Sequence, residues 1–325
     1  MEKEMLSNRK FPLVFCTVFM MLFIALPLSA ETDLKTDVQS ETMLTLALST
    51  RPEAKLTLGQ SFTVPFLQGN NPLTQGNNIK FDLKAEITPI AMGLISGITW
   101  TPIAIFEVSA GGSVGSGWNV GDSITGIGLN VPKYDEDTGQ YTTSVDGERF
   151  DGTFSGVHFG GAFQFNFGAI FPGDWNQVLL RSYHQMGHRT YSRAGPGDPW
   201  FFENDYGENQ NGWRYNASYF IGYRMPLFLN TIGIMADMEK YLYDTPGGGA
   251  WGDSLARWDL GLLMNFTIIE NMSAAVLTQF RFYRKYAGFT YYEDYRYYRH
   301  RELLDSNSRD FKFYRVELLI NYKIK

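Results

Sequence analysis

Cysteine is almost absent from this chain, which has one, Cys16, among 325 residues. A single cysteine excludes a disulfide framework and a cluster of thiolate metal ligands. Charge is also scarce: 19% of the residues are Asp, Glu, Lys or Arg, against about 25% in an ordinary soluble domain. The net charge of -6 argues against a nucleic-acid partner, because nucleic-acid-binding proteins normally carry a basic surface.

Long apolar segments are lacking beyond the first thirty residues, and the mean hydropathy is only -0.21. These two absences exclude a bundle of membrane-spanning helices. Aromatic residues and glycine are abundant instead, with 25 Phe, 19 Tyr, 7 Trp and 33 Gly. This composition favours an all-β protein, in water or in a membrane.

Residues 1–30 have the parts of a cleaved signal peptide. Lys3, Arg9 and Lys10 form a basic start, and an apolar run follows that ends in small residues. We expect cleavage after this segment, which removes the only cysteine; an uncleaved membrane anchor is the alternative. Residues 31–41 are polar and predict a flexible periplasmic lead-in.

From residue 42 onward, apolar and polar side chains alternate with a period of two. This period marks a β-strand whose two faces meet different surroundings. Phe81 and Leu83, for example, alternate with Asp82 and Lys84. The alternating segments last about 10–13 residues, against about 5–6 in soluble sheets and about 9–11 in membrane-spanning strands. Their length therefore favours strands that cross a membrane.

The composition of the two faces points the same way. A soluble sheet turns a densely charged face to water and buries its apolar face. Here the polar face is rich in Gly, Ser, Asn and Thr, and the apolar face ends in large aromatics, as lipid-facing strands do at both interfaces. With the export signal, this predicts a transmembrane antiparallel up-and-down β-barrel over residues 42–325, in the outer membrane of a Gram-negative-type envelope. A secreted soluble β-protein is the alternative.

Twelve strands are predicted, with ten as the alternative, because one-chain bacterial barrels have an even number. The ten clear segments are residues 79–88, 93–101, 104–117, 152–168, 177–192, 212–225, 231–243, 255–268, 273–287 and 309–325. Two weaker segments, 42–49 and 55–66, complete twelve and require Pro65 to lie at a strand end. Short turns alternate with long polar connections, which we expect on the extracellular side. The long connections are residues 118–150, 193–211, 244–254 and 288–308.

The alternation assigns the strand residues to two faces. The predicted lumen-facing residues are Lys80, Asp82, Lys84, Glu86, Glu107, Arg214, Arg224, Asp237, Glu239, Arg257, Asp259, Arg281, Arg315 and Glu317. The predicted lipid-facing residues are Phe159, Phe163, Phe165, Trp258, Leu260, Leu262, Phe280, Leu318, Ile320 and Tyr322. The alternation also puts Tyr314 on the lipid-facing side.

Unpaired charges in a low dielectric cost several kcal/mol each, so we expect the lumen charges to pair or to contact water. The pattern favours a narrow pore for small polar solutes. A non-conducting surface barrel with adhesive or structural loops is the second interpretation. The expected partners are outer-membrane lipid and the barrel-assembly machinery, although the chain ends in Lys325 and lacks the terminal aromatic residue usual in such barrels.

Signals for catalysis, metals and cofactors are weak, and none of the three is predicted. Ser182 and His184 share a face and loosely resemble the dyad of outer-membrane phospholipase, where the histidine instead precedes the serine; a lipid hydrolase is the third interpretation. The acidic residues between Asp135 and Asp151 lack EF-hand spacing and indicate a solvated loop. The small residues at 111–117 lack a phosphate-loop lysine and predict close packing or a bend.

The segment 283–301 is rich in tyrosine and arginine. We expect an aromatic belt that continues into an extracellular hairpin, with arginines near lipid head groups. A surface that contacts a glycan or a host protein is the alternative.

Four stretches together carry a family resemblance. They are Thr101-Pro102-Ile103-Ala104 through Gly117-Trp118, Phe171-Pro172-Gly173-Asp174-Trp175-Asn176, Met238-Glu239-Lys240-Tyr241-Leu242-Tyr243-Asp244-Thr245-Pro246-Gly247, and Phe313-Tyr314-Arg315-Val316. Through them, residues 79–325 resemble a group of uncharacterised outer-membrane β-barrel proteins of spirochaetes. The resemblance implies a location and a fold, and no activity or site.

Overall fold

The computed structural model describes residues 37–51, 53–120, 124–137, 140–203, 207, 209–243, 256–291, 299–304 and 309–324. The predicted signal peptide lies outside these residues. The predicted lead-in is described only from Asp37, and the first strand already begins at Gln39.

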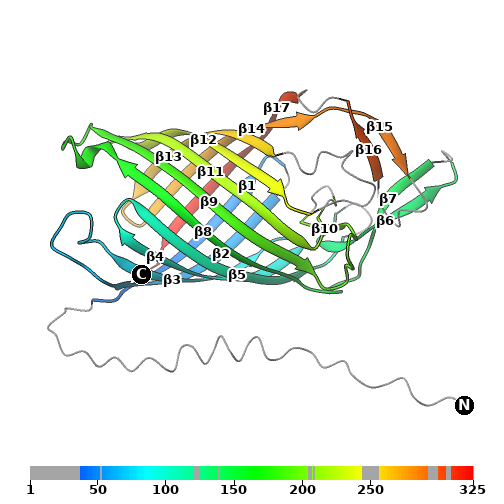
Figure 1. The fold of residues 1–325 in the computed structure, drawn as a ribbon, viewed down its shortest axis with the longest axis horizontal. Helices are drawn as coiled ribbons and strands as arrows, with labels where there is room; N and C mark the ends of the chain where they lie inside the picture. The colour runs from blue at the N-terminus through cyan, green and yellow to red at the C-terminus, as the bar shows by residue number, and fades with distance from the viewer. Residues whose placement is uncertain are drawn as a thin grey trace, which may run out of the picture. The chain divides into compact units, whose positions relative to one another are not determined.

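Twelve strands form one closed antiparallel barrel, in the order β1-β17-β14-β13-β12-β11-β9-β8-β5-β4-β3-β2 (Figure 1). They are β1 (Gln39–Ser49), β2 (Glu53–Pro65), β3 (Asn78–Ile87), β4 (Ala91–Ile103), β5 (Phe106–Gly117), β8 (Phe154–Asn166), β9 (Gln177–Tyr191), β11 (Gly212–Arg224), β12 (Leu229–Tyr241), β13 (Arg257–Ile269), β14 (Met272–Arg284) and β17 (Arg309–Lys323). Pairing of β1 with β17 closes the sheet. The prediction of twelve strands is confirmed, and Pro65 is the last residue of β2.

The long connections lie together at one end of the barrel, opposite the C-terminus (Figure 1). They follow β5, β9, β12 and β14, while the turns after β8, β11 and β13 lie at the other end. This arrangement follows from the antiparallel meander, in which every second connection returns to the same end. One connection departs from the predicted pattern, because residues 66–77 form a longer loop at the short-turn end.

Three of the long connections contain strands that the sequence reading treated as loops. β6 (Ile127–Asp135), β7 (Gln140–Asp146) and β10 (Trp200–Phe202) form a three-stranded sheet that joins the connections after β5 and β9. β15 (Tyr286–Tyr291) pairs with β16 (Arg299–Leu303) in the connection after β14. The acidic segment is therefore mostly a hairpin. β10 escaped prediction because it is short and its partner lies in another loop.

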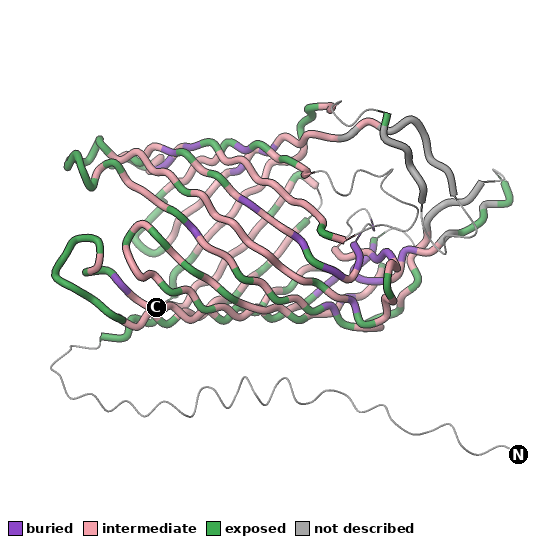
Figure 2. Tube along the Cα trace, viewed as in Figure 1, coloured by how far each residue is buried: buried purple, intermediate pink, exposed green. Residues whose placement is uncertain are grey.

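One face of the barrel wall, here called the apolar face, exposes large hydrophobic side chains. Six of the predicted lipid-facing residues are 36–54% exposed, namely Phe159, Phe163, Trp258, Leu260, Leu262 and Tyr322. Phe165, Phe280, Leu318 and Ile320 are partly buried. Buried residues are sparse along the strands and gather most densely at the long-loop end (Figure 2). A band of exposed aromatic and aliphatic side chains this wide requires an apolar medium around it.

Tyr314 lies on the other side of the sheet from the one predicted. The pairing of β14 with β17 shifts register at this residue, because Gln279 pairs with Arg315 while Phe280 pairs with Phe313. The extra residue is a β-bulge, which reverses the alternation locally. The Tyr314 ring consequently lies 3.6 Å from the guanidinium carbon of Arg281.

A charge in the middle of the apolar face should destabilise the barrel strongly. We expect Leu262→Arg to lower the free energy of unfolding in lipid vesicles by about 2–4 kcal/mol, because the guanidinium would lie in hydrocarbon. Thr99→Arg is the matched control, because Thr99 of β4 lies on the face of the sheet opposite the apolar face. This substitution should change the free energy of unfolding by less than about 1 kcal/mol. Urea titration of both variants measures the difference, and equal losses would contradict this assignment of faces.

Candidate functional site

The face opposite the apolar face, here called the polar face, carries a cluster of ion pairs across β11, β12 and β13. The register places Glu239 between Asn216 of β11 and Arg257 of β13. Glu239 accepts hydrogen bonds from Arg214 Nη1 at 3.3 Å and from Arg257 Nη2. The Arg214 side chain is only 7% exposed, so its charge depends on this carboxylate.

A second pair continues the cluster into β14. Asp259 and Arg281 are direct cross-strand partners. Arg281 donates from Nε and Nη2 to the two carboxylate oxygens of Asp259, at 2.7 and 2.6 Å. Such a fork geometry is the strongest form of the arginine–carboxylate pair. The Arg281 guanidinium also packs on the Tyr314 ring, so its polar and apolar surfaces are both occupied.

Two further ion pairs reach across an intervening strand. Arg181 of β9 contacts Glu107 of β5 at 3.0 Å, passing over Ala162 of β8. Arg315 of β17 contacts Glu53 of β2 at 2.8 Å, passing over β1. Side chains two strands apart meet most easily on the concave side of a curved sheet, where they converge. These contacts therefore favour the polar face as the inside of the barrel.

Most of the predicted lumen-facing charges are paired. Lys80 contacts Asp82 at 3.2 Å, and Glu86 contacts Lys55 at 3.6 Å. Glu317 contacts Arg315 at 3.1 Å. Of the fourteen predicted residues, Lys84, Arg224 and Asp237 have no ion pair with any residue that the structure describes.

The sequence reading missed several partners in these pairs. They are Glu53, Lys55, Arg181 and, because of the bulge, Tyr314. The alternation of Glu53 and Lys55 with Ala54 and Leu56 was a usable signal. It was overlooked because this first hairpin was the weakest part of the predicted barrel.

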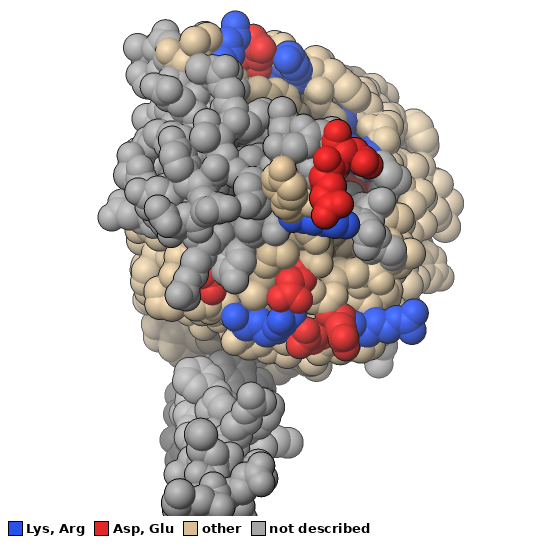
Figure 3. Space-filling model, turned by 90° about the vertical axis from the view of Figure 1, so that its right-hand side faces the viewer, with Lys and Arg blue, Asp and Glu red and all other residues tan. Residues whose placement is uncertain are grey.

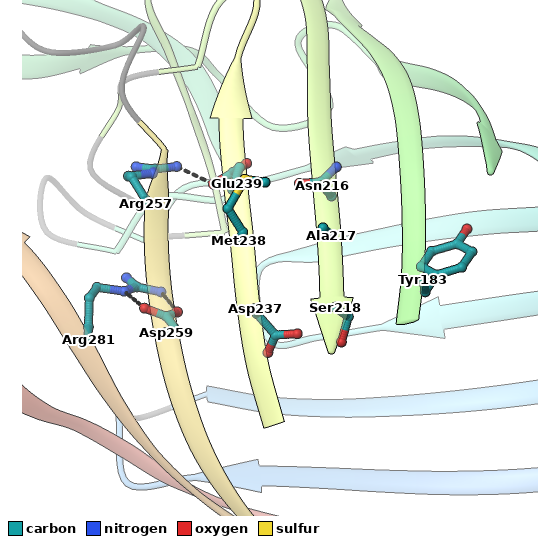
Figure 4. A pocket seen from close by; sticks show the side chains of 10 residues that line it. All are labelled: Tyr183, Asn216, Ala217, Ser218, Asp237, Met238, Glu239, Arg257, Asp259 and Arg281. Carbon is teal, nitrogen blue, oxygen red and sulfur yellow. Dashed lines mark hydrogen bonds and ion pairs between the residues drawn. The ribbon is translucent and has the colours of Figure 1, made fainter. Parts of the chain in front are cut away.

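A cavity of about 300 Å³ lies against this charged wall (Figure 4). Its lining residues are Tyr183, Asn216, Ala217, Ser218, Asp237, Met238, Glu239, Arg257, Asp259 and Arg281. Asp237 and Asp259 are cross-strand partners within it. The cavity thus brings together two arginines and three carboxylates, with neutral hydrogen-bonding groups beside them.

Another part of the polar face, on β4, β5 and β8, is rich in glycine and other small residues and is here called the glycine wall. Aromatic rings lie flat on two of these glycines: a Cβ added to Gly160 would lie 2.8 Å from Tyr183 Oη, and one added to Gly111 would lie 2.7 Å from His158 Cε1. The small residues at 111–117 therefore allow close packing, as predicted. Gly97 differs, because a Cβ there would have only the carbonyl oxygen of Ala110 nearby, at 3.7 Å.

The long-loop end of the barrel is partly covered by the sheet of β6, β7 and β10. Ile127, Trp200, Phe154 and Tyr191 form a small buried core there, and Trp200 is 0% exposed. Phe154 and Tyr191 belong to the ends of β8 and β9, so this core fixes the loops to the barrel wall. Asn209 extends the contact, accepting a hydrogen bond from Arg214 Nη2 at 2.6 Å. Acidic and basic side chains both appear on this end (Figure 3).

Glu203, directly after β10, lies between distant strands of the barrel. Its carboxyl interacts electrostatically with Lys55 and Glu86 on β2 and β3, and with Arg189 on β9. Burial raises the pKa of the Glu203 carboxyl, and Lys55 opposes the shift. The backbone has a φ of 50°, and the Glu203 N–H donates to the Gly126 carbonyl at 2.9 Å. Because β9 is far from β2 and β3 in the strand order, these interactions place the Glu203 carboxyl over the barrel interior.

Ser182 and His184 meet on the apolar face. Ser182 Oγ lies 2.9 Å from His184 Nε2, and His184 Nδ1 lies 2.5 Å from the Tyr215 hydroxyl. The hydroxyl, imidazole and phenol groups thus hydrogen-bond to one another on a face whose other side chains are mostly apolar. Ser182 and His184 pair with Tyr219 and Ala217, midway between Trp213 and Tyr223, the aromatic residues near the two ends of β11.

Metal-binding and surface features are few. No group of three His, Cys, Asp or Glu that could hold a metal ion occurs in the described part of the chain. In the acidic segment, Asp146 and Asp151 instead bind Arg193.

Most side chains of the tyrosine- and arginine-rich segment lie outside the described residues. Within the residues described, no helix is long and apolar enough to cross a membrane.

Comparisons with known proteins give structural likenesses only. No family model and no curated protein matches the chain. The KdgM porin in complex with disordered oligogalacturonate is similar over 88% of this chain and 99% of its own, with 10% identity and a TM-score of 0.35. The NanC porin is similar over 87% of this chain and 100% of its own, with 4% identity and a TM-score of 0.39. The transport unit of the autotransporter AIDA-I from Escherichia coli is similar over 94% of this chain and 97% of its own, with 8% identity and a TM-score of 0.33. Likeness at this level carries no functional argument.

Removal of the shared carboxylate in the first cluster should be costly. We expect Glu239→Gln to lower the free energy of unfolding by about 3 kcal/mol, because the buried Arg214 loses its counter-charge. Asp82→Asn removes a carboxylate from a more exposed pair and should cost less than about 1 kcal/mol. Urea unfolding of both variants tests the difference, and a loss no larger for Glu239→Gln would contradict the role assigned to this pair.

Proposed function

We propose that this chain forms an outer-membrane pore for small polar solutes, with the polar face as its lumen. The observation that carries the proposal is the division of that face into a charged wall on β11–β14 and a glycine wall on β4, β5 and β8. Charged side chains keep the interior wet, and small residues opposite them, Gly97 above all, leave room for a solute. On this proposal, the apolar face contacts lipid and the long loops are extracellular.

The covered mouth makes the proposed pore narrow. The Glu203 carboxyl lies over the barrel interior, and the loop core around Trp200 holds this turn in place. A solute entering from this end would have to pass beside Glu203, Lys55 and Arg189. The proposal therefore excludes large or folded cargo and favours small molecules.

Pairing of the lumen charges limits the field inside the pore. Arg281 with Asp259 and Arg181 with Glu107 are neutral as pairs, so most of the wall offers polarity without a large net charge. Solutes that carry hydrogen-bonding groups, and not simple ions of one sign, suit such a lining. The location in the outer membrane, and insertion there by the barrel-assembly machinery, belong to the same proposal.

Blocking the glycine wall tests the pore. We expect Gly97→Trp to lower the single-channel conductance of purified protein in planar bilayers to less than half, because the indole would occupy free space on the polar face. Gly161→Trp is the matched control: Gly161 lies on the apolar face, where a Cβ has its nearest atom at 3.4 Å, and its conductance should be unchanged. A wild-type protein without conductance steps, or equal effects of the two variants, would overturn the proposal.

The hydrogen bond between Ser182 and His184 favours a second candidate, an acyl-ester hydrolase. Ser182 Oγ would attack the ester carbonyl while His184 Nε2 takes its proton and passes it to the leaving alcohol; water would then release the acid from the serine ester. This candidate ranks second because the pair lies midway between Trp213 and Tyr223, whereas phospholipid esters lie at the membrane interface.

Labelling with a fluorophosphonate probe tests the hydrolase. If Ser182 is an activated nucleophile, the wild type will react, Ser182→Ala will not, and His184→Ala will react at least a hundredfold more slowly. Ser96→Ala removes another serine of the apolar face and should leave labelling intact. Absence of labelling in the wild type would eliminate this candidate.

A further inference from the structure

We propose that the cavity on β9 and β11–β14 binds the primary amine of a solute, with the ammonium held against the Asp237 carboxylate and the Ser218 hydroxyl. The proposal deepens the pore function, because it names a class of solute and places its site halfway along the lumen. It rests on the way in which the charges of the cavity are paired.

Asp237 is the carboxylate of the cavity that lacks a counter-charge. Ser218 donates a hydrogen bond to it, and its cross-strand partner on β13 is another carboxylate, Asp259. Arg315 is the basic group that interacts with it electrostatically, and Arg315 is itself held by Glu53 at 2.8 Å and Glu317 at 3.1 Å. Among the described residues, Asp237 makes no ion pair.

The arginines of the cavity are already committed to other carboxylates. Arg281 uses two donors on Asp259, and Arg257 donates to both Glu239 and the Tyr241 hydroxyl. Of the three carboxylates that line the cavity, Glu239 is shared by Arg214 and Arg257 and Asp259 is held by Arg281, which leaves Asp237 as the one without an ion pair among the described residues. An anionic solute would have to displace an existing partner, whereas a cation would complete the pairing of Asp237.

The neutral groups around Asp237 suit an ammonium better than a larger cation. An ammonium has three N–H donors on one atom. Asp237 and Ser218 are neighbours on adjacent strands, and Asn216 lies on the same face two residues away along β11 (Figure 4). Carboxylate, hydroxyl and amide oxygens can thus accept all three hydrogens. The cavity volume of about 300 Å³ holds a small amine with its first few carbon atoms.

Block of the channel current tests the site. Ethylenediamine added to wild-type channels should reduce the current with saturation, and Asp237→Asn should weaken this block at least tenfold, because a charge-assisted hydrogen bond is lost. Asp82→Asn is the matched control: it removes the same charge from the polar face outside the cavity and should leave the block unchanged. Acetate and glucose are the probe controls and should not block.

Equal weakening by Asp82→Asn and Asp237→Asn would overturn the site, because it would show a general field effect. An unchanged block in Asp237→Asn would overturn it as well. If Asp237→Asn fails to fold, Ser218→Ala is the second variant, because it keeps the charge of Asp237. We expect Ser218→Ala to weaken the block severalfold, and an unchanged block would overturn the site.

Calorimetric titration of ethylenediamine into the detergent-solubilised barrel separates this inference from the pore function. Binding that is lost in Asp237→Asn, in a protein that does not conduct, would support the amine site and refute the pore. Conductance without saturable binding would support the pore and refute the amine site.

Discussion

The closed hydrogen-bonded ladder is the constraint on which the rest of this structure depends. In hydrocarbon, a strand with unpaired N–H and C=O groups costs several kcal/mol for each group, so a sheet that crosses a membrane must close on itself. Pairing of β1 with β17 achieves this closure. Once the sheet is closed, the pleat directs alternate side chains to its two sides. Each strand therefore presents one set of side chains to the inside of the barrel and the other set to its surroundings.

The polar side meets a second constraint, because charges confined in a narrow space must be neutralised. Arg214, Glu239 and Arg257 share their charges across three strands, and Arg281 and Asp259 form a closed pair. The glycines of β4, β5 and β8 balance the volume of these long side chains. Long charged side chains and small residues therefore lie on different strands of the polar face.

The strands and their faces could be predicted because a period of two leaves a direct trace in the sequence. Phe163 and Leu260, for example, each lie between small or polar neighbours. The prediction fails at Tyr314, where a bulge inserts one residue and reverses the alternation. No local feature of Phe313-Tyr314-Arg315 announces the bulge, because it results from the register of β17 against β14.

From the sequence by itself we could predict a barrel of twelve strands, with ten as the alternative, the faces of most strand residues and the grouping of the long connections at one end, since these follow from alternation and segment length. Only the tertiary structure decided which charges pair, that Asp237 makes no ion pair with any described residue, and that the Glu203 carboxyl lies near charges of both β2 and β9. Those outcomes depend on strand register and on contacts between distant loops. Such contacts join residues far apart in the chain, so no local pattern records them.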